Sequence, residues 1–318
     1  MTMKNLTRAE AAGLLLVHDR FCILTHRRPD GDTVGSAAAL CLGLRKLGKT
    51  AHILINPDAS TCQFNGLMEN LTTDAAEEGD TLVAVDVAAP EMLPRSFAPL
   101  ADKVTLCIDH HGSATPFAAN TLVDSTSASC AELTLDVLTL LGVEMDRDIA
   151  EAVYVGASTD TGCFRFANTT AHTFFVASLC ARAGARIHKL NQELFETNSL
   201  AKLRLQAWIT ENLKIFGDGK FAVVAIPRAV EDLLGVTEDD VSNISSFPRT
   251  VAGVCLAATL RQTKSGETKI SVRAVPGYDA AALCAIFGGG GHKGAAGASS
   301  SLPLQDAAKA VEDAMLEM

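Results

Sequence analysis

The sequence has few aromatic side chains and no long apolar run. Aromatic residues make up only 5% of the 318 residues, so large rings contribute little to any core. No segment approaches the roughly 18 uninterrupted apolar residues of a membrane-spanning helix. The N-terminus also lacks a charged-then-apolar leader with a cleavage site. We therefore expect neither export nor membrane insertion.

Paired cysteines and an excess of basic charge are absent too. The nine cysteines include no CxxC pair and mostly lie in apolar segments, a usage that fits a reducing, cytoplasmic compartment. With 27 Lys and Arg against 37 Asp and Glu, the formal net charge is −10. Tight binding to long nucleic acid needs a broad basic surface, so we expect none. Short anionic substrates remain compatible, because bound metal ions would supply positive charge.

Apolar segments of strand length alternate with amphipathic segments along the first part of the chain. The length indicates about two domains. Strands are predicted at 21–25, 51–55, 82–87 and 104–108, and helices at 34–47, 127–141, 147–155 and 170–183. This alternation predicts an α/β fold with a doubly wound, mainly parallel sheet over residues 1–186.

The pattern changes twice after this first domain. Residues 187–216 are polar with helical periodicity, which predicts a helical linker. Residues 217–318 predict a smaller α/β domain, with strands at 221–226, 251–259 and 269–275 and a hairpin turn at Ser265-Gly266.

Four segments of the first domain end in acidic or histidine-rich turns. The side chains concerned are His26, Asp30 and Asp32 in the first turn, Asp86 in the second, Asp109, His110 and His111 in the third, and Asp160 after a helical run. Because the carboxyl ends of parallel strands meet at one edge of a sheet, we expect these side chains to gather there. Carboxylates and imidazoles in such a cluster suit divalent cations. Taken alone, the first turn could also be an ordinary connection whose aspartates only cap a helix.

The triplet Asp109-His110-His111, together with the other three motifs in order, resembles the DHH family of phosphoesterases. The glycine-rich segment 288–297, GGGGHKGAAG, is similar to the motif of the DHH-associated substrate domain. The resemblance covers nearly the whole chain. It is strongest to the two-domain members that act as oligoribonucleases (nano-RNases) and as phosphatases of 3′-phosphoadenosine-5′-phosphate (pAp).

The resemblance implies two divalent cations in the first domain. One would take His26, Asp30 and Asp86, and the other Asp32, Asp86, His110 and Asp160, so that Asp86 is shared. Two cations about 3.5–4 Å apart can stabilise the attacking and departing oxygens of an in-line displacement. An oxygen-rich set with two imidazoles favours Mn²⁺, with Mg²⁺ or Co²⁺ as substitutes. Asp109 is expected to orient an imidazole, and His111 to contact the phosphoryl group or protonate the leaving group.

Further residues are expected to bind substrate. Arg273 would hold a terminal phosphate bidentately, and His292 would contact a phosphate or a base. The glycines Gly289, Gly290 and Gly291 would bring backbone N–H groups close to an anion. Arg165 would touch either the substrate or a surface carboxylate, and the sequence does not choose between them.

The resemblance implies a hydrolase that cleaves short RNA to nucleoside monophosphates and also removes the 3′-phosphate of pAp. We expect short RNA or a nucleotide to bind in a cleft between the domains, without long nucleic acid or membrane partners; a homodimer is left open. One alternative is a phosphodiesterase for linear or cyclic dinucleotides of the pApA type. Another is a non-catalytic nucleotide-binding protein, which would carry little Mn²⁺.

Overall fold

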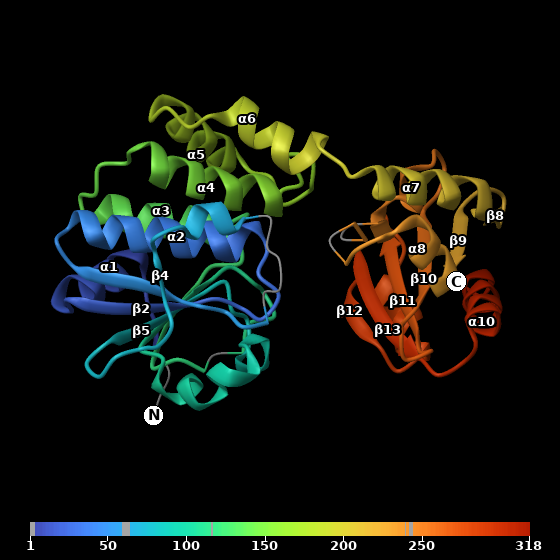
Figure 1. Cartoon of the computed structure of the whole chain (residues 1–318), viewed down its shortest axis with the longest axis horizontal. Helices are drawn as coiled ribbons and strands as arrows, with labels where there is room; N and C mark the ends of the chain where they lie inside the picture. The colour runs from blue at the N-terminus through green and yellow to red at the C-terminus, as the bar shows by residue number, and fades with distance from the viewer. Residues whose placement is uncertain (1–3, 59–63, 116, 239, 242–243) are drawn as a thin grey trace. The chain divides into compact units, whose positions relative to one another are not determined.

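The computed structural model describes residues 4–58, 64–115, 117–238, 240–241 and 244–318 (Figure 1). The chain divides into two compact units, Met1–Thr197 and Asn198–Met318. The segment predicted as a linker contributes to both. Its first part forms α6 (Ile187–Asn191) and η4 (Gln192–Glu196), and its second part forms α7 (Leu200–Asn212) and β8 (Lys214–Phe216). We keep the two-domain division as a proposal, with the break after Thr197.

A seven-stranded parallel sheet forms the centre of the first unit, in the order β1-β7-β6-β5-β2-β3-β4. The strands are β1 (Lys4–Asn5), β2 (Arg20–Leu24), β3 (Thr50–Leu54), β4 (Thr72–Thr73), β5 (Thr81–Val85), β6 (Leu106–Asp109) and β7 (Asn120–Val123). The predicted parallel sheet is confirmed, and its four predicted strands correspond to β2, β3, β5 and β6.

The order of strands reverses between β2 and β5. After β2 the chain runs outward to β3 and β4, then returns to place β5 on the other side of β2 and continues to β6 and β7. Ligands of open α/β sheets bind at such a switch point, outside the carboxyl ends of the strands. The turns that follow β2, β5 and β6 therefore share one edge of the sheet.

Helices cover one face of this sheet in two layers. The helices are α1 (Arg8–Val17), α2 (Gly31–Lys46), α3 (Cys130–Leu140), α4 (Arg147–Asp160) and α5 (Ala171–Arg182). Both α2 and α3 pack on the strands, and Figure 1 shows α4 and α5 on their far side. The short helix η1 (Asn65–Met68) contacts α2.

The opposite face is covered by short 3₁₀ segments, η2 (Pro90–Met92) and η3 (Arg95–Lys103). Phe97 from η3 and Leu93 beside it join the apolar cluster on this face. Because both faces are buried, the central strands are apolar at nearly every position, as in parallel sheets generally.

Helices α2 and α4 cross with their backbones in contact. A Cβ atom placed on Gly35 of α2 would lie 2.3 Å from the carbonyl oxygen of Ala152 on α4. A Cβ atom on Gly156 of α4 would also lie 2.4 Å from the Cβ of Ala131 on α3 and 2.8 Å from Oδ1 of Asp32 on α2. This close crossing brings the beginning of α2 beside the end of α4. The prediction that the helix ends at 155 was wrong, because Gly156 is tolerated at this contact and α4 continues to Asp160.

A six-stranded mixed sheet forms the second unit, in the order β12-β13-β11-β10-β9-β8. The remaining strands are β9 (Phe221–Ile226), β10 (Leu256–Gln262), β11 (Thr268–Ala274), β12 (Gly290–His292) and β13 (Ala295–Ser300). The remaining helices are α8 (Arg228–Leu234), α9 (Ala280–Ile286) and α10 (Leu304–Leu316), with the short η5 (Ile244–Ser246) and η6 (Pro248–Thr250). Only β9 and β10 pair in parallel; the other pairs are antiparallel.

The hairpin predicted in the second unit is present, and one of its strands begins later than predicted. The hairpin is confirmed, since β10 and β11 pair antiparallel around a turn in which Gly266 has a φ of +87°. The strand predicted at 251–259 was placed too early, because Pro248 opens a 3₁₀ turn and Gly253 adopts a φ of +87°. The strand therefore begins at Leu256.

No helix in the described ranges is long and apolar enough to span a membrane. The cysteines of those ranges are free thiols, and most of them are buried. Cys62, which contributes to the count of nine, lies outside the described residues.

Candidate metal centre

Seven side chains meet at the carboxyl edge of the parallel sheet. His26 follows β2, Asp30 and Asp32 begin α2, Asp86 follows β5, His110 and His111 follow β6, and Asp160 ends α4. Their nitrogen and oxygen atoms form three groups, each with atoms within 4.8 Å of one another: His26, Asp30 and Asp86; Asp32, His110 and Asp160; and Asp86, His110 and His111. All six predicted metal ligands are among them, and their assignment to two cations stays a prediction.

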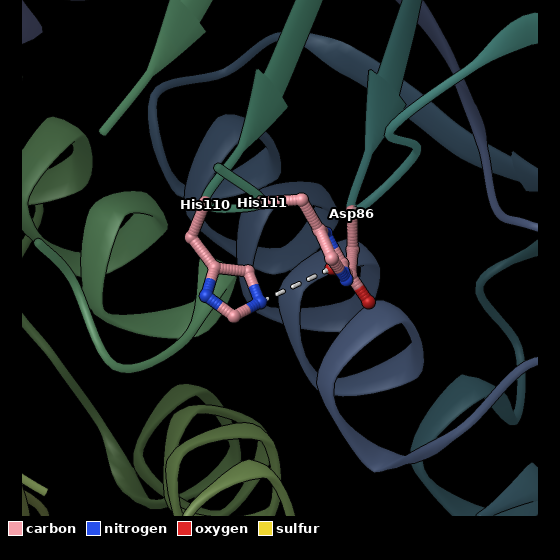
Figure 2. A group of neighbouring side chains, drawn as sticks. All are labelled: Asp86, His110 and His111. Atoms are coloured by element: carbon pink, nitrogen blue, oxygen red, sulfur yellow. Dashed lines mark ion pairs between the residues drawn. The ribbon is translucent and has the colours of Figure 1, made fainter. Parts of the chain in front are cut away.

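Asp86 lies at the centre of this arrangement. Its φ is +59°, a left-handed conformation that residues other than glycine seldom adopt and that is frequent at functional sites. One carboxylate oxygen lies 3.6 Å from Nε2 of His26, and the other lies 3.7 Å from Nε2 of His110. Figure 2 shows this carboxylate facing the two consecutive histidines. Asp86 is thus the carboxylate that contacts histidines of both predicted cation sites.

Asp32 joins the centre to the beginning of α3. Its buried carboxylate accepts the backbone N–H of Cys130 at 2.6 Å and that of Ala131 at 2.9 Å. These are the first two residues of α3, so the positive end of that helix supports the negative charge. The same carboxylate lies 3.6 Å from Nε2 of His110.

Negative charge is concentrated at this edge. In the described part of the chain, five aspartates form ion pairs only with histidines: Asp30, Asp32, Asp86, Asp109 and Asp160. Burial, reinforced by the charges of Asp86 and Asp30, raises the pKa of Asp160 to about 7. Burial also raises the pKa of Asp32 well above its usual value, with Asp86 and Asp160 adding to the effect. Such crowding of carboxylates is unfavourable unless cations neutralise it.

Two atoms at the centre fit a bound cation. Oδ1 of Asp86 and Nε2 of His110 are buried and have no hydrogen-bond partner within the described ranges. A buried polar atom without a partner calls for an explanation such as a bound ion. The other ring nitrogen of His110 lies 3.4 Å from the carbonyl oxygen of Ser127. With the proton on that nitrogen, Nε2 is free to coordinate a metal.

Asp109 contacts His111 and is not part of the three groups. Its fully buried carboxylate accepts from Nδ1 of His111 at 2.8 Å and from the backbone N–H of His110 at 2.8 Å. The hydrogen bond that Nδ1 of His111 donates to Asp109 raises the pKa of His111 to about 9, against the opposing effect of burial. The role of Asp109 in orienting an imidazole stays a prediction, and the ring that it contacts is that of His111.

Arg165 lies in the turn after α4 and is exposed. Its Nε donates to the carbonyl oxygen of Gly162 at 2.5 Å. The sequence left two possible partners for Arg165, the substrate or a surface carboxylate. Among the described residues, no carboxylate pairs with it.

The substrate residues predicted in the second unit lie on its glycine-rich edge and on β11. The half-buried guanidinium of Arg273 donates to the carbonyl oxygen of Val272 at 3.0 Å, and burial lowers its pKa. A Cβ atom on Gly289 would lie 2.2 Å from the carbonyl oxygen of Gly297, so only glycine fits there. β12, which holds Gly290, Gly291 and His292, is an exposed edge strand. The roles of these residues stay predictions.

Several contributors to the centre were not predicted. Cys130 and Ala131 act through backbone N–H groups and Ser127 through its carbonyl oxygen. Asn56, which follows β3, donates to the carbonyl oxygen of His26 at 2.7 Å and so supports that loop. Backbone contacts have no residue-type signature. The sequence placed the start of α3 at 127, whereas in the structure Ser129 caps it and the helix begins at Cys130.

Comparison with known proteins identifies two matching domain families. Residues 20–157 match the DHH family, N-terminal domain, and residues 218–317 match the DHHA1 domain. The chain is 33% identical to the "Bifunctional oligoribonuclease and PAP phosphatase NrnA" of Thermus thermophilus, covering 98% of this chain and 93% of that protein. It is 26% identical to the protein of the same name from Bacillus subtilis, covering 92% and 93%.

Two solved structures share the fold. An exopolyphosphatase-related protein from Bacteroides fragilis superposes with a TM-score of 0.85 at 22% identity, over 98% of this chain and 96% of that one. RecJ of Thermus thermophilus in complex with Mn²⁺ gives a TM-score of 0.56 at 15% identity, over 96% of this chain and 53% of that one.

Proposed function

Because the chain belongs to the DHH family and carries a DHHA1 domain, we propose that it is a metal-dependent phosphoesterase of short oligoribonucleotides and of pAp. It would release nucleoside monophosphates from the first substrate, and AMP and phosphate from the second. The observation that carries this proposal is a pair of buried atoms, Oδ1 of Asp86 and Nε2 of His110, that lack a hydrogen-bond partner among the described residues and lie inside a group of crowded aspartates. Similarity along nearly the full length to NrnA of Thermus thermophilus supports the choice of substrates.

Two divalent cations, most suitably Mn²⁺, would be held by the six predicted ligands. The first would contact His26, Asp30 and Asp86, and the second Asp32, Asp86, His110 and Asp160. Oxygen-rich sites with two imidazoles suit Mn²⁺, Mg²⁺ or Co²⁺ better than Zn²⁺, which favours thiolates and further imidazoles. When bound, such cations supply positive charge to the oxygens of the reacting phosphoryl group.

The remaining groups of the centre would handle the proton. His111 is 33% exposed in its side chain, and its Nδ1 is held by Asp109, so its other ring nitrogen is available to a substrate. An imidazolium in this position can hydrogen-bond a phosphoryl oxygen or give a proton to the departing oxygen. Asp109 would act by fixing the ring and favouring its charged form.

In the second unit, Arg273 would bind a phosphate of the substrate, and Gly289, Gly290, Gly291 and His292 would bind the adjoining nucleoside. The exposed edge of β12 and the absence of side chains at its glycines support this role. We also propose a cytoplasmic location, which mostly buried, unpaired thiols in the described ranges support.

A panel of substrates tests the proposal. The purified protein would be incubated with Mn²⁺ and, separately, with pAp, dinucleotides, five-nucleotide RNA, 24-nucleotide RNA and pyrophosphate, and the products would be separated by chromatography. We expect hydrolysis of pAp and of the short RNAs. Hydrolysis of pyrophosphate alone would refute the proposal, and so would a protein that retains no Mn²⁺ and hydrolyses none of these compounds.

A further inference from the structure

We propose that the turn after α4 forms a nucleobase-binding subsite, in which the ring of Phe166 stacks on a base and Arg165 holds a neighbouring phosphate. This inference rests on the proposed function, because it concerns the nucleotide whose phosphate occupies the metal centre. It assigns a role to an aromatic side chain in a chain that has few of them.

The turn is held in an unusual backbone conformation. Gly162, Cys163 and Phe164 have φ values of +57°, +59° and +62°, so three consecutive residues are left-handed. This conformation is unfavourable for residues with a Cβ and occurs mostly as isolated residues. Hydrogen bonds maintain it, including one from the N–H of Cys163 to the carbonyl oxygen of Ser158 at 2.6 Å. Strain that the surrounding structure maintains in this way is frequent at ligand sites.

This turn places the rings of Phe164 and Phe166 in different environments. Phe164 packs against the protein, with its ring centroid 5.6 Å from that of Phe174 in a stacked geometry and 5.9 Å from that of Tyr154. Phe166 is 53% exposed, and its ring lies over Gly162, where a Cβ atom would come within 2.3 Å of a ring carbon. The Phe166 ring is therefore supported from below by backbone and presents a face to solvent.

The turn folds back onto the metal centre. The N–H groups of Arg165 and Phe166 donate to the carbonyl oxygen of Thr161 at 2.9 and 3.0 Å, one residue beyond Asp160. The side-chain amide of Asn168 donates to the carbonyl oxygen of Asp160 at 3.1 Å. The same amide donates to the carbonyl oxygen of Ala128 at 3.1 Å. Ala128 follows Ser127, whose carbonyl oxygen lies near the ring of His110. These contacts hold the turn beside the backbone of Asp160, and we infer that the base of a nucleotide whose phosphate lies at the centre is placed against it.

Arg165 and Phe166 together suit the phosphate and the base of a nucleotide. Arg165 uses Nε to contact Gly162, and its terminal nitrogens donate to no residue in the described ranges. They are available to a phosphate, which a guanidinium binds through parallel hydrogen bonds. A phenylalanine face binds any base by stacking, without regard to its identity. Such a subsite suits an enzyme that must accept short RNAs of varied sequence.

Steady-state kinetics on the full chain with Mn²⁺ test this subsite. The substrates are the 5′-phosphorylated dinucleotide pApA and two modified forms of it. One form lacks the base of the first nucleotide, and the other lacks the base of the second. The variants are Phe166→Leu, Phe166→Tyr and, as a control, Phe175→Leu, because Phe175 is equally exposed at 56% but lies on α5. We expect Phe166→Leu to raise KM for the complete substrate by about tenfold with little change in kcat, the effect of removing one stacked base. Phe166→Tyr and Phe175→Leu should stay within about twofold of wild type.

The base-free substrates decide whether the effect is due to stacking. For one of them, the difference in KM between wild type and Phe166→Leu should disappear, and that substrate identifies the stacked nucleotide. If the difference persists for both, the ring has only a structural role and the subsite is refuted. An unchanged KM, or a change of oligomeric state in Phe166→Leu without a change of KM, would refute it as well. In each case wild-type hydrolysis of the complete substrate shows that the proposed function itself holds.

Discussion

Among single side chains, Asp86 is the one on which both predicted cation sites depend. Its carboxylate faces His26 with one oxygen and His110 with the other. We expect Asp86→Asn to lose more than nine-tenths of the activity on every substrate, because the amide cannot supply the shared negative charge. Asparagine tolerates a left-handed φ, so circular dichroism should show an unchanged fold. A variant that keeps a tenth or more of wild-type turnover would contradict the two-cation assignment.

His111 should respond differently from Asp86. Its Nδ1 is occupied by Asp109, and we assign it to the substrate instead of a cation. His111→Ala should lower kcat by about 10²-fold or more, the usual effect of removing a general acid. Bound metal, measured by mass spectrometry after gel filtration, should remain at the wild-type ratio. Loss of metal from His111→Ala, with His172→Ala as a control from outside the centre, would make His111 a ligand.

The residue types of the centre were predictable because acidic and histidine-rich turns directly follow apolar strands in the sequence. Which imidazole Asp109 orients was not predictable, since His110 and His111 are neighbours and the choice depends on side-chain rotamers. The contacts of Asp32 with the start of α3 were also hidden, because the two partners are backbone groups 98 and 99 positions away in the sequence.

For helices, the crossing of α2 and α4 is the contact most sensitive to added volume. Gly35→Ala would place a methyl group 2.3 Å from a backbone oxygen, which cannot move out of the way as a side chain could. We expect the free energy of unfolding in urea to fall by about 1–3 kcal/mol, and activity to fall with it, because the crossing sets the position of Asp32 relative to Asp160. Gly13→Ala is the control: it lies within α1 with nothing within 4 Å of the added atom. That variant should gain about 0.5–1 kcal/mol.

An ion pair joins α4 to the start of α6 and should make stability depend on pH. Glu151 is buried and accepts from Nε and Nη2 of Arg186 at 2.6 Å each, and from its backbone N–H at 3.0 Å. These hydrogen bonds hold the pKa of Glu151 below its usual value of 4.5, with burial opposing them. The pair therefore contributes its full stability above about pH 4.5 and loses it as the pH falls through the lower, folded pKa.

We accordingly expect Glu151→Gln to lower the free energy of unfolding by about 1 kcal/mol at pH 7, a modest figure because Arg186 is half exposed. The difference from wild type should shrink at about pH 3. Unfolding in urea at both pH values measures it, with Glu193→Gln as a control because its pair with Lys189 is exposed on both sides. A difference that is the same at both pH values would show that the glutamate acts by packing alone.

Strands with apolar segments were predictable from the sequence, and strands without such segments were not. β2, β5 and β6 carry apolar segments that are buried on both faces, and β3 is apolar apart from Thr50 and His52, so the positions of these strands were found within a residue or two. β1 and β4 have two residues each, too few for periodicity to be recognised. β7 is as long as β6, but polar Asn120 and Thr121 fill half of its four positions, so it shows no apolar segment. These strands exist because a neighbour offers an open edge for pairing, which depends on the tertiary structure.

At the scale of the whole molecule, the acidic balance and the small number of aromatic residues should limit substrate length. A long single strand needs a basic track interleaved with aromatics, and the net charge of −10 is opposite in sign. We expect kcat/KM to fall steeply from RNAs of two to five nucleotides to one of 24 nucleotides. Product analysis at equal substrate concentration measures this. Equal or faster hydrolysis of the 24-nucleotide RNA would point to a processive exonuclease.

The close crossing of α2 and α4 also bears on how this protein can change over generations. The separation of Asp32 and Asp160 depends on a contact between Gly35 of α2 and the main chain of α4, to which most side chains of the crossing do not contribute. A lineage could exchange many of the aliphatic residues around the crossing, by mutations that compensate one another, and keep the spacing of the centre. One methyl group at Gly35 or Gly156 would disturb it at once. The chain can therefore drift widely in its core while remaining restricted at a few positions that have no side chain at all.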